Sequence, residues 1–170
     1  MSTYELQTQQ VDETTQKPVC CPPFHSALWD GKTFEWDHKK FIRDHVLTLF
    51  YVPINFGAVM KRSGIAIDNS DSKAVESMWL ADHTSPWNMD LYIAVEREVA
   101  DVENVVLSGK YISRVYEGAY KEIGTWKKDF EKYVKESNNS LTRTYLWYTT
   151  CPKCAKKYGK NYVVFIGQIQ

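Results

Sequence analysis

The sequence predicts an α+β fold in which a strand–helix–strand–strand unit occurs twice, around a central ligand cleft. The first unit spans residues 46–99 and the second spans residues 105–169. Runs of apolar, β-branched and aromatic residues predict the strands, and apolar residues at helical spacing predict the helix of the second unit. The corner Phe56-Gly57-Ala58 matches Glu117-Gly118-Ala119, and this agreement in order and spacing favours a duplicated βαββ unit. Two such units packed side by side leave a cleft between their sheets.

The residues before the first unit form an extension. Residues 1–19 are rich in Gln, Thr and Glu, which predicts a mobile tail, and residues 20–170 then form a single domain. Segment 24–45 carries three of the four histidines, His25, His38 and His45, and alternates only briefly at 34–36. We expect this extension to cover or brace one side of the domain.

The elements of each unit follow from local patterns. In the first unit we expect a strand bent by Pro53, a short helix and two further strands at 46–56, 57–67, 75–81 and 89–99. A turn at 83–87 separates the last two. In the second unit we expect a strand, an amphipathic helix and two strands at 105–117, 118–136, 141–148 and 161–169. Cys151-Pro152-Lys153-Cys154 then forms a hairpin tip between the final strands.

Composition limits the classes of partner. The net formal charge is zero and the pI is near 6.9, which does not favour nucleic acid or an anionic membrane surface. No apolar run reaches the roughly 20 residues that span a bilayer, and the polar N-terminus shows no signal peptide. We therefore expect a cytoplasmic protein with reduced cysteines. Its six Trp and eleven Tyr are suited to lining a small-molecule pocket.

Several motifs of the second unit resemble one known superfamily. They are Gly109-Lys110-Tyr111, the corner 116–120 with the helix and strands after it, and the run 148–162 around the cysteines. These residues resemble the gyrase-inhibitor-like (GyrI-like) small-molecule-binding superfamily, closely over 105–169 and more weakly over 46–99. The resemblance implies two βαββ units around a ligand cleft. The superfamily includes effector-binding domains of transcription regulators, stand-alone binders, and hydrolases that open cyclopropane-bearing genotoxins.

Glu117 is the first candidate catalytic residue. It ends a predicted strand just before Gly118, where a carboxylate would cap the helix and contribute about 1 kcal/mol. The resemblance implies instead that the acidic residue at this corner faces the ligand, where it would act as a general base. Tyr92 and Tyr148 are the candidates for an accompanying acid that protonates a developing oxyanion.

Aromatic residues are the candidate ligand-binding residues. Trp87, Tyr116, Tyr145 and Trp147 lie on strands or turns that should border the cleft. Alternation along a strand places Tyr145 and Trp147 on one face of the sheet, and Tyr148 on the other. Ordinary core packing is the alternative role for each of them.

Cys151 and Cys154 have the spacing of a zinc knuckle or a redox dithiol. A structural zinc ion needs four ligands, which Cys20, Cys21 or His25 could complete. The resemblance implies a stand-alone branch for this cysteine turn but says nothing about its chemistry. A thioredoxin-type motif sits where a strand leads into a helix, which argues against redox chemistry in a hairpin. A reduced structural turn is the third alternative, and no other cofactor is expected.

The sequence thus predicts a protein that binds a small, largely apolar or aromatic organic molecule. A hydrolase that opens an electrophilic, cyclopropanoid-type compound with Glu117 as base is one interpretation. A non-enzymatic sequestering or effector-sensing protein needs the same aromatic walls but no base. A thiol-redox or structural zinc protein is the third hypothesis.

Overall fold

The computed structural model describes residues 21–170, so the predicted tail at residues 1–19 and Cys20 lie outside the described residues. The fold is of the predicted α+β class, with seven strands and three α-helices. In chain order the elements are η1 (Ser26–Leu28), β1 (Lys32–Leu49), β2 (Val52–Pro53), α1 (Phe56–Asn69), β3 (Ala74–Ser85), β4 (Asn88–Val95), β5 (Glu103–Glu117), η2 (Tyr120–Glu122), α2 (Ile123–Glu136), β6 (Leu141–Tyr148), α3 (Pro152–Tyr158) and β7 (Tyr162–Ile169).

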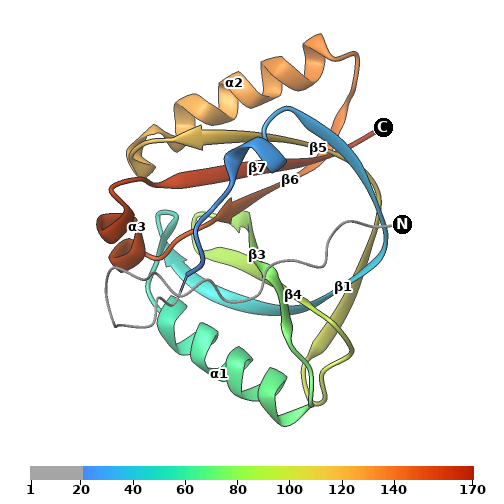
Figure 1. Ribbon diagram of the computed structural model, residues 1–170, viewed down its shortest axis with the longest axis vertical. Helices are drawn as coiled ribbons and strands as arrows, with labels where there is room; N and C mark the ends of the chain where they lie inside the picture. Colours follow the sequence, from blue (N-terminus) through green and yellow to red (C-terminus); the bar gives the residue numbers. More distant parts are fainter. Residues whose placement is uncertain (1–20) are drawn as a thin grey trace.

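All strands belong to one antiparallel sheet that closes on itself. Their order is β2-β1-β4-β3-β6-β7-β5, and β5 also pairs with β1. The long, curved strands β1 and β5 make this closure (Figure 1). Ile42 on β1, for example, pairs with Ile93 on β4 and with Asn104 on β5. In the β3–β6 pairing, Leu80 lies opposite Trp147 and Ala81 opposite Leu146; we call this pairing the seam. Together with the β1–β5 pairing, it joins the strands of residues 32–95 to those of residues 103–169.

The two long helices cover one face of the sheet, which we call the helix face. Helices α1 and α2 lie at opposite ends of the molecule with the strands between them (Figure 1). Their buried residues, among them Val59 on α1 and Phe130 on α2, share one apolar core with Leu91, Leu146 and other strand residues. Amphipathic spacing explains this packing best for α2, where Trp126, Phe130 and Val134 are buried and most of the remaining side chains are charged.

The opposite face of the sheet, which we call the inner face, is filled by aromatic side chains. Its buried members include Trp36, Tyr92, Tyr111, Tyr145 and Trp147, mostly in edge-to-face or tilted contacts. Phe24 and Trp29 come from the segment before β1 and pack on Trp147 at ring-centroid distances of 5.5 and 5.1 Å. This segment therefore braces one side of the domain.

Strand β1 begins at Lys32, well before the predicted start at residue 46. The register shifts between Trp36 and Lys39, and His38 adopts a φ of 55°. This irregularity breaks the alternation of apolar and polar residues that a strand normally shows. His38 and His45 both lie on β1.

The cysteine turn is not a hairpin tip, as the sequence predicted, but the start of helix α3. Pro152 occupies the first turn of α3, where its missing N–H costs no hydrogen bond. Gly159 ends the helix with a φ of 67°, a left-handed conformation that glycine adopts without strain. Short helices of this kind leave no apolar periodicity long enough to detect in the sequence.

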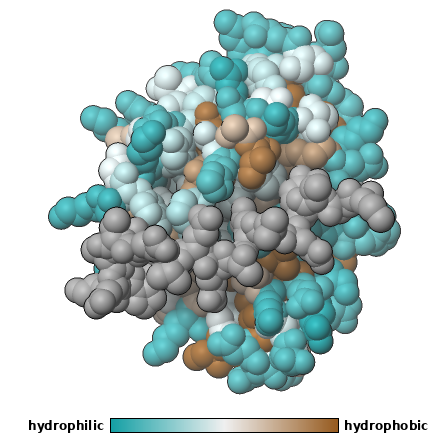
Figure 2. All heavy atoms as spheres, viewed as in Figure 1, coloured by the Kyte–Doolittle hydropathy of each residue, from teal (hydrophilic) through white to brown (hydrophobic). Residues whose placement is uncertain are grey.

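No helix within residues 21–170 is both long and apolar enough to cross a membrane. The surface over α2 is mainly hydrophilic, and hydrophobic patches lie nearer the middle of the face shown in Figure 2.

Candidate functional site

The seam gathers a chain of rings on the helix face, between the start of α1 and the turn before α2. We call this group the seam cluster. Its members come from the β1–β2 connection, α1, β3, η2 and β6, and they are Tyr51, Phe56, Trp79, His83, Tyr120 and Tyr148. Tyr51 and Tyr120 are exposed by 54% and 40%, whereas the other four members are partly buried. The cluster is therefore open to solvent at its edge and closed at its base.

Direct ring contacts connect the members of the cluster. Trp79 stacks on Tyr148 at 5.6 Å between ring centroids, and Phe56 lies 5.2 Å from Trp79. Tyr120 meets Tyr148 edge-on at 5.6 Å, and Tyr51 meets His83 at 6.0 Å. Flat rings arranged in this way present faces and edges on which an apolar or aromatic molecule can stack.

His83 and Tyr148 form the polar centre of the seam cluster. The Nε2 atom of His83 lies 3.4 Å from the hydroxyl oxygen of Tyr148. The Nδ1 atom of His83 is buried and has no hydrogen-bond partner among the described residues. Burial lowers the pKa of His83, so the imidazole is neutral at pH 7 and can accept a proton. Burial, and to a lesser extent Tyr120, raises the pKa of Tyr148, which keeps the phenol protonated as a donor.

Local backbone geometry places Tyr120 at this site. Gly118 has a φ of 149°, which only glycine adopts readily. A Cβ at Gly118 would lie 2.5 Å from Oε2 of Glu122 and 3.0 Å from the Trp126 ring. The chain turns here from β5 into the 3-10 turn η2, so α2 begins at Ile123, later than the predicted residue 118.

Glu117 lies at the end of β5, on the opposite face from Tyr148. It is exposed and pairs with Tyr162, whereas Tyr116 and Tyr148 both pair with Val163. Because successive side chains of a strand alternate, Glu117 belongs to the inner-face row and Tyr148 to the helix-face row. The structure therefore does not bring these two residues together as an acid–base pair.

Tyr116 lies on the helix face but within the packing of α2. Its ring stacks on Trp126 at 5.5 Å, and its hydroxyl donates to Asp129 at 2.7 Å. Burial, together with the carboxylate of Asp129, raises the pKa of Tyr116. These contacts assign Tyr116 a packing role beside the seam cluster.

The remaining aromatic candidates lie elsewhere. Tyr92, Tyr145 and Trp147 are buried in the inner face, where Tyr92 meets Tyr145 edge-on at 5.5 Å. Trp87 lies in the β3–β4 connection, is 54% exposed, and contacts Phe50 at 4.9 Å. Of the residues predicted for catalysis or ligand binding, Tyr148 is the one that the structure places in the seam cluster.

Sequence reasoning missed five members of the seam cluster, including Trp79 and His83. Strand β3 continues to Ser85, beyond the predicted end at residue 81, so His83 is a strand residue and not a turn residue. Alternation from Trp79 through Ala81 to His83 would have placed the two rings on one face. The polar sequence Asp82-His83-Thr84-Ser85 hides this continuation.

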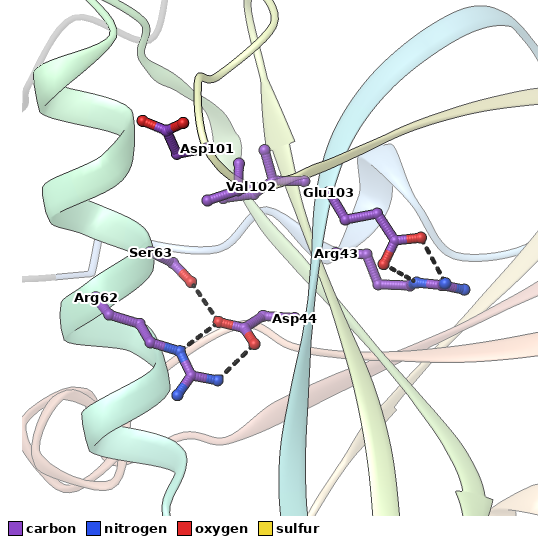
Figure 3. Close-up of a pocket in the computed structure, with 8 residues that line it drawn as sticks. Arg43, Asp44, Arg62, Ser63, Asp101, Val102 and Glu103 are labelled. Atoms are coloured by element: carbon purple, nitrogen blue, oxygen red, sulfur yellow. Dashed lines mark hydrogen bonds and ion pairs between the residues drawn. The ribbon is translucent and has the colours of Figure 1, made fainter.

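A separate hollow of about 380 Å³ lies between α1 and β1 (Figure 3). Four of its five charged side chains already bind one another: Arg62 pairs with Asp44, and Arg43 with Glu103, whereas Asp101 also lines the hollow. Although burial alone would raise the pKa of Asp44, the Arg62 guanidinium holds it below 3.8. Because most of these charged groups are mutually satisfied, the hollow offers a ligand few polar contacts, and the seam cluster remains the better candidate site.

Three cysteines meet beside the seam cluster. The sulfur atoms of Cys21, Cys151 and Cys154 all lie within 4.8 Å of one another. Cys154 is buried and the other two are partly buried. Burial raises the pKa of the Cys21 thiol. Burial also raises the pKa of Tyr120, and the thiols of Cys151 and Cys21 raise it further, which places the two sites close together. Cys151 and Cys154 lie where strand β6 leads into helix α3, so the predicted hairpin position, which disfavoured redox chemistry, was wrong.

Comparisons with solved structures show a shared fold. The C-terminal domain of EcmrR superposes with a TM-score of 0.64 at 9% identity, covering 84% of this chain and 98% of that domain. A hydrolase from Listeria innocua gives a TM-score of 0.57 at 8% identity, covering 83% of this chain and 92% of that one. No curated protein matches the chain significantly.

A protein-family model described as bacterial hydrolase matches residues 11–169. Together with the structural neighbours, this match fits the GyrI-like effector-binding fold that the sequence resembles. The stand-alone branch and the relation to cyclopropanoid hydrolases stay predictions. The chain belongs to the bacterial hydrolase family.

Proposed function

We propose that the protein binds a small, largely apolar or aromatic electrophile in the seam cluster and hydrolyses it with His83 as the base and Tyr148 as the acid. The observation that carries this proposal is the His83–Tyr148 pair at 3.4 Å, surrounded by aromatic rings and partly removed from solvent. Membership of the bacterial hydrolase family supports hydrolysis as the reaction class. His83 replaces Glu117 as the proposed base because Glu117 lies on the opposite face of the sheet.

The substrate class follows from the rings and from the resemblance to cyclopropanoid hydrolases. A spirocyclopropyl dienone is flat, apolar and electrophilic, and its carbonyl oxygen becomes a phenol when the cyclopropane opens. Its ring can stack on the exposed edge of the cluster, beside Tyr120 and Tyr51. Exclusion of water by the aromatic walls strengthens the polar contacts at the centre.

The proton transfers through His83 and Tyr148 leave neither side chain with a net change in charge. With the imidazole proton on Nε2, His83 donates to the Tyr148 oxygen, and Nδ1 is left to accept a proton from an enclosed water. The water oxygen bonds to the cyclopropane methylene carbon as the adjacent ring C–C bond breaks. Those electrons aromatise the dienone, whose oxygen takes the hydroxyl proton of Tyr148. Nε2 of His83 then returns a proton to Tyr148, so both side chains end neutral with the imidazole proton on Nδ1. Transfer of that proton back to Nε2 through water after product release restores the starting tautomer.

The test is turnover of a simple spirocyclopropyl cyclohexadienone, followed by the appearance of the ring-opened alcohol. We expect His83→Gln and Tyr148→Phe each to lower kcat/KM by about 100-fold or more. His38→Gln is the matched control, because the His38 side chain is 81% exposed on β1. Wild-type turnover in His83→Gln would exclude the proposed base. Equal losses in His38→Gln would show that the assay does not report on the seam cluster.

Non-enzymatic binding is the second candidate function. It is favoured because none of the six members of the seam cluster carries a carboxylate, the usual partner of a general-base histidine. In this case the dienone quenches Trp fluorescence at saturation but is recovered unchanged. The quenching should weaken in Trp79→Phe and persist in the control Trp87→Phe. Multiple turnovers per chain would exclude this function.

A further inference from the structure

The sulfur cluster joins two segments that are far apart in the sequence. Cys21 lies 130 residues before Cys151, yet the backbone N–H of Cys151 donates to the sulfur of Cys21 at 3.4 Å. The hydroxyl of Tyr158, at the end of α3, donates to the carbonyl oxygen of Cys21 at 2.7 Å. The fold thus holds Cys21 against both ends of α3, through its sulfur at one end and its carbonyl oxygen at the other.

The geometry of α3 directs two thiols to one point. Cys151 precedes the helix in an extended conformation, and Cys154 lies in its first turn. The sulfurs of both residues lie within 4.8 Å of the Cys21 sulfur, so both face the Cys21 segment. Backbone N–H groups that point at cysteine sulfur stabilise a thiolate, and such bonds typically accompany metal-bound cysteine.

The spacing of the sulfurs fits a tetrahedral metal ion. With Zn–S bonds of about 2.3 Å, tetrahedral geometry requires sulfurs about 3.8 Å apart. The three sulfurs already lie within 4.8 Å of one another, so a closure of about 1 Å by side-chain rotation suffices. The charge also fits, because Lys153, Lys156 and Lys157 on α3 offset the negative charge that three thiolates would leave around a divalent ion.

We propose that Cys21, Cys151 and Cys154 bind one Zn²⁺ ion, with the fourth position completed by another donor or by water. The soft thiolate set selects zinc over magnesium or calcium, which prefer oxygen ligands. The bound ion fastens the segment after Cys21 to α3. Because Phe24 and Trp29 in that segment pack on Trp147, the metal clamps the extension over the inner aromatic face.

The clamp also borders the proposed active site. Tyr120 belongs to the seam cluster, and the thiols of Cys151 and Cys21 contribute to its electrostatic environment. A zinc ion at the cysteines would therefore hold the α3 side of the seam cluster in place. This role does not depend on the reaction proposed for His83, so metal binding and turnover can be tested separately.

The test is metal analysis of the full chain purified under reducing conditions with added zinc, by native mass spectrometry and by competition with a chromophoric chelator. We expect one zinc per chain, and an affinity that falls at least about 100-fold in each of Cys21→Ser, Cys151→Ser and Cys154→Ser. His25→Ala is the matched control, because His25 is exposed four positions from Cys21 and lies outside the group of donor atoms that the three cysteines form, so we expect it to retain full zinc affinity.

Cobalt keeps the proposal falsifiable if a serine variant fails to fold. Co²⁺ added to the wild-type chain should give the thiolate-to-metal charge-transfer band and the visible spectrum of a tetrahedral site, both reversed by zinc. The proposal is overturned by a folded wild-type chain that takes up no zinc. An intramolecular disulfide that persists under reducing conditions, seen as a mass lower by two hydrogens, would also overturn it.

Discussion

His83 and Tyr148 approach within 3.4 Å across the seam, although 65 residues separate them in the sequence. One residue comes from β3 and the other from the end of β6. Their contact therefore depends on the β3–β6 pairing, and loss of this pairing would separate the two residues of the proposed site.

The titration of His83 is the first prediction. Burial lowers its pKa, so an NMR titration of the imidazole should give a midpoint below 6.5. The unfolded chain then binds this proton more readily than the folded chain, so the contribution of His83 to stability is complete above pH 6.5 and falls as the pH drops from there towards the folded pKa. The wild type should therefore lose more unfolding free energy than His83→Gln between pH 7.5 and 5.5 in urea titrations (~2 pH units spanning the unfolded pKa of about 6.5).

The second prediction compares two tyrosine hydroxyls. The Tyr111 hydroxyl is fully buried without a hydrogen-bond partner among the described residues, and burial raises its pKa to about 12. Tyr111→Phe removes this unsatisfied group, so we expect it to stabilise the fold by about 1 kcal/mol. Tyr116→Phe, which loses the hydrogen bond to Asp129, should destabilise it by about 1 kcal/mol.

Chemical denaturation of both tyrosine variants beside the wild type measures this difference. A destabilised Tyr111→Phe would show that the hydroxyl has a partner that residues 21–170 do not supply, such as a bound water or ligand.

The third prediction concerns glycine packing. A Cβ at Gly167 on β7 would collide with the side chain of Leu141 and lie 3.1 Å from the Phe130 ring. Gly167→Ala should therefore cost about 1–3 kcal/mol of unfolding free energy through overpacking of the α2 core.

The matched control for that variant is Gly124→Ala. Gly124 lies on the exposed side of α2, where a Cβ meets nothing within 4 Å. Because alanine favours a helix over glycine, the variant should gain about 0.5–1 kcal/mol. Equal effects of the two substitutions in thermal or urea unfolding would contradict the described packing of Phe130.

The fold was predictable where sequence periodicity is strong. The amphipathic helix α2 and the apolar strands of the second half follow from residues that repeat at their structural period, and the α+β class follows from them. The first part of strand β1 was not predicted, because its bulge near His38 interrupts the alternation of apolar and polar residues. Helix α3 was not predicted, because its seven residues make too few turns to show an apolar stripe in the sequence.

The site was less predictable, because it depends on which strands are neighbours. Trp79 and Tyr148 meet only because β3 pairs with β6, a relationship that local patterns do not encode. Residue chemistry alone allowed Cys21 to share a metal site with Cys151 and Cys154. The fold adds the distances, because it brings the three sulfurs within 4.8 Å of one another. Catalytic roles for Glu117 and Tyr92 stay predictions, and neither residue is a member of the seam cluster.

The pairing of β1 with both β4 and β5 has a consequence for how the chain reaches its native state. Lys32 pairs with Ser113 and Arg43 with Glu103, so closure requires contacts between residues far apart along the chain. Contacts of high sequence separation carry a large loop-closure entropy before they return any stabilisation, and such topologies fold in about milliseconds to seconds. Neither half completes the ladders of β1 without the other, so folding and unfolding should proceed as one cooperative, comparatively slow transition.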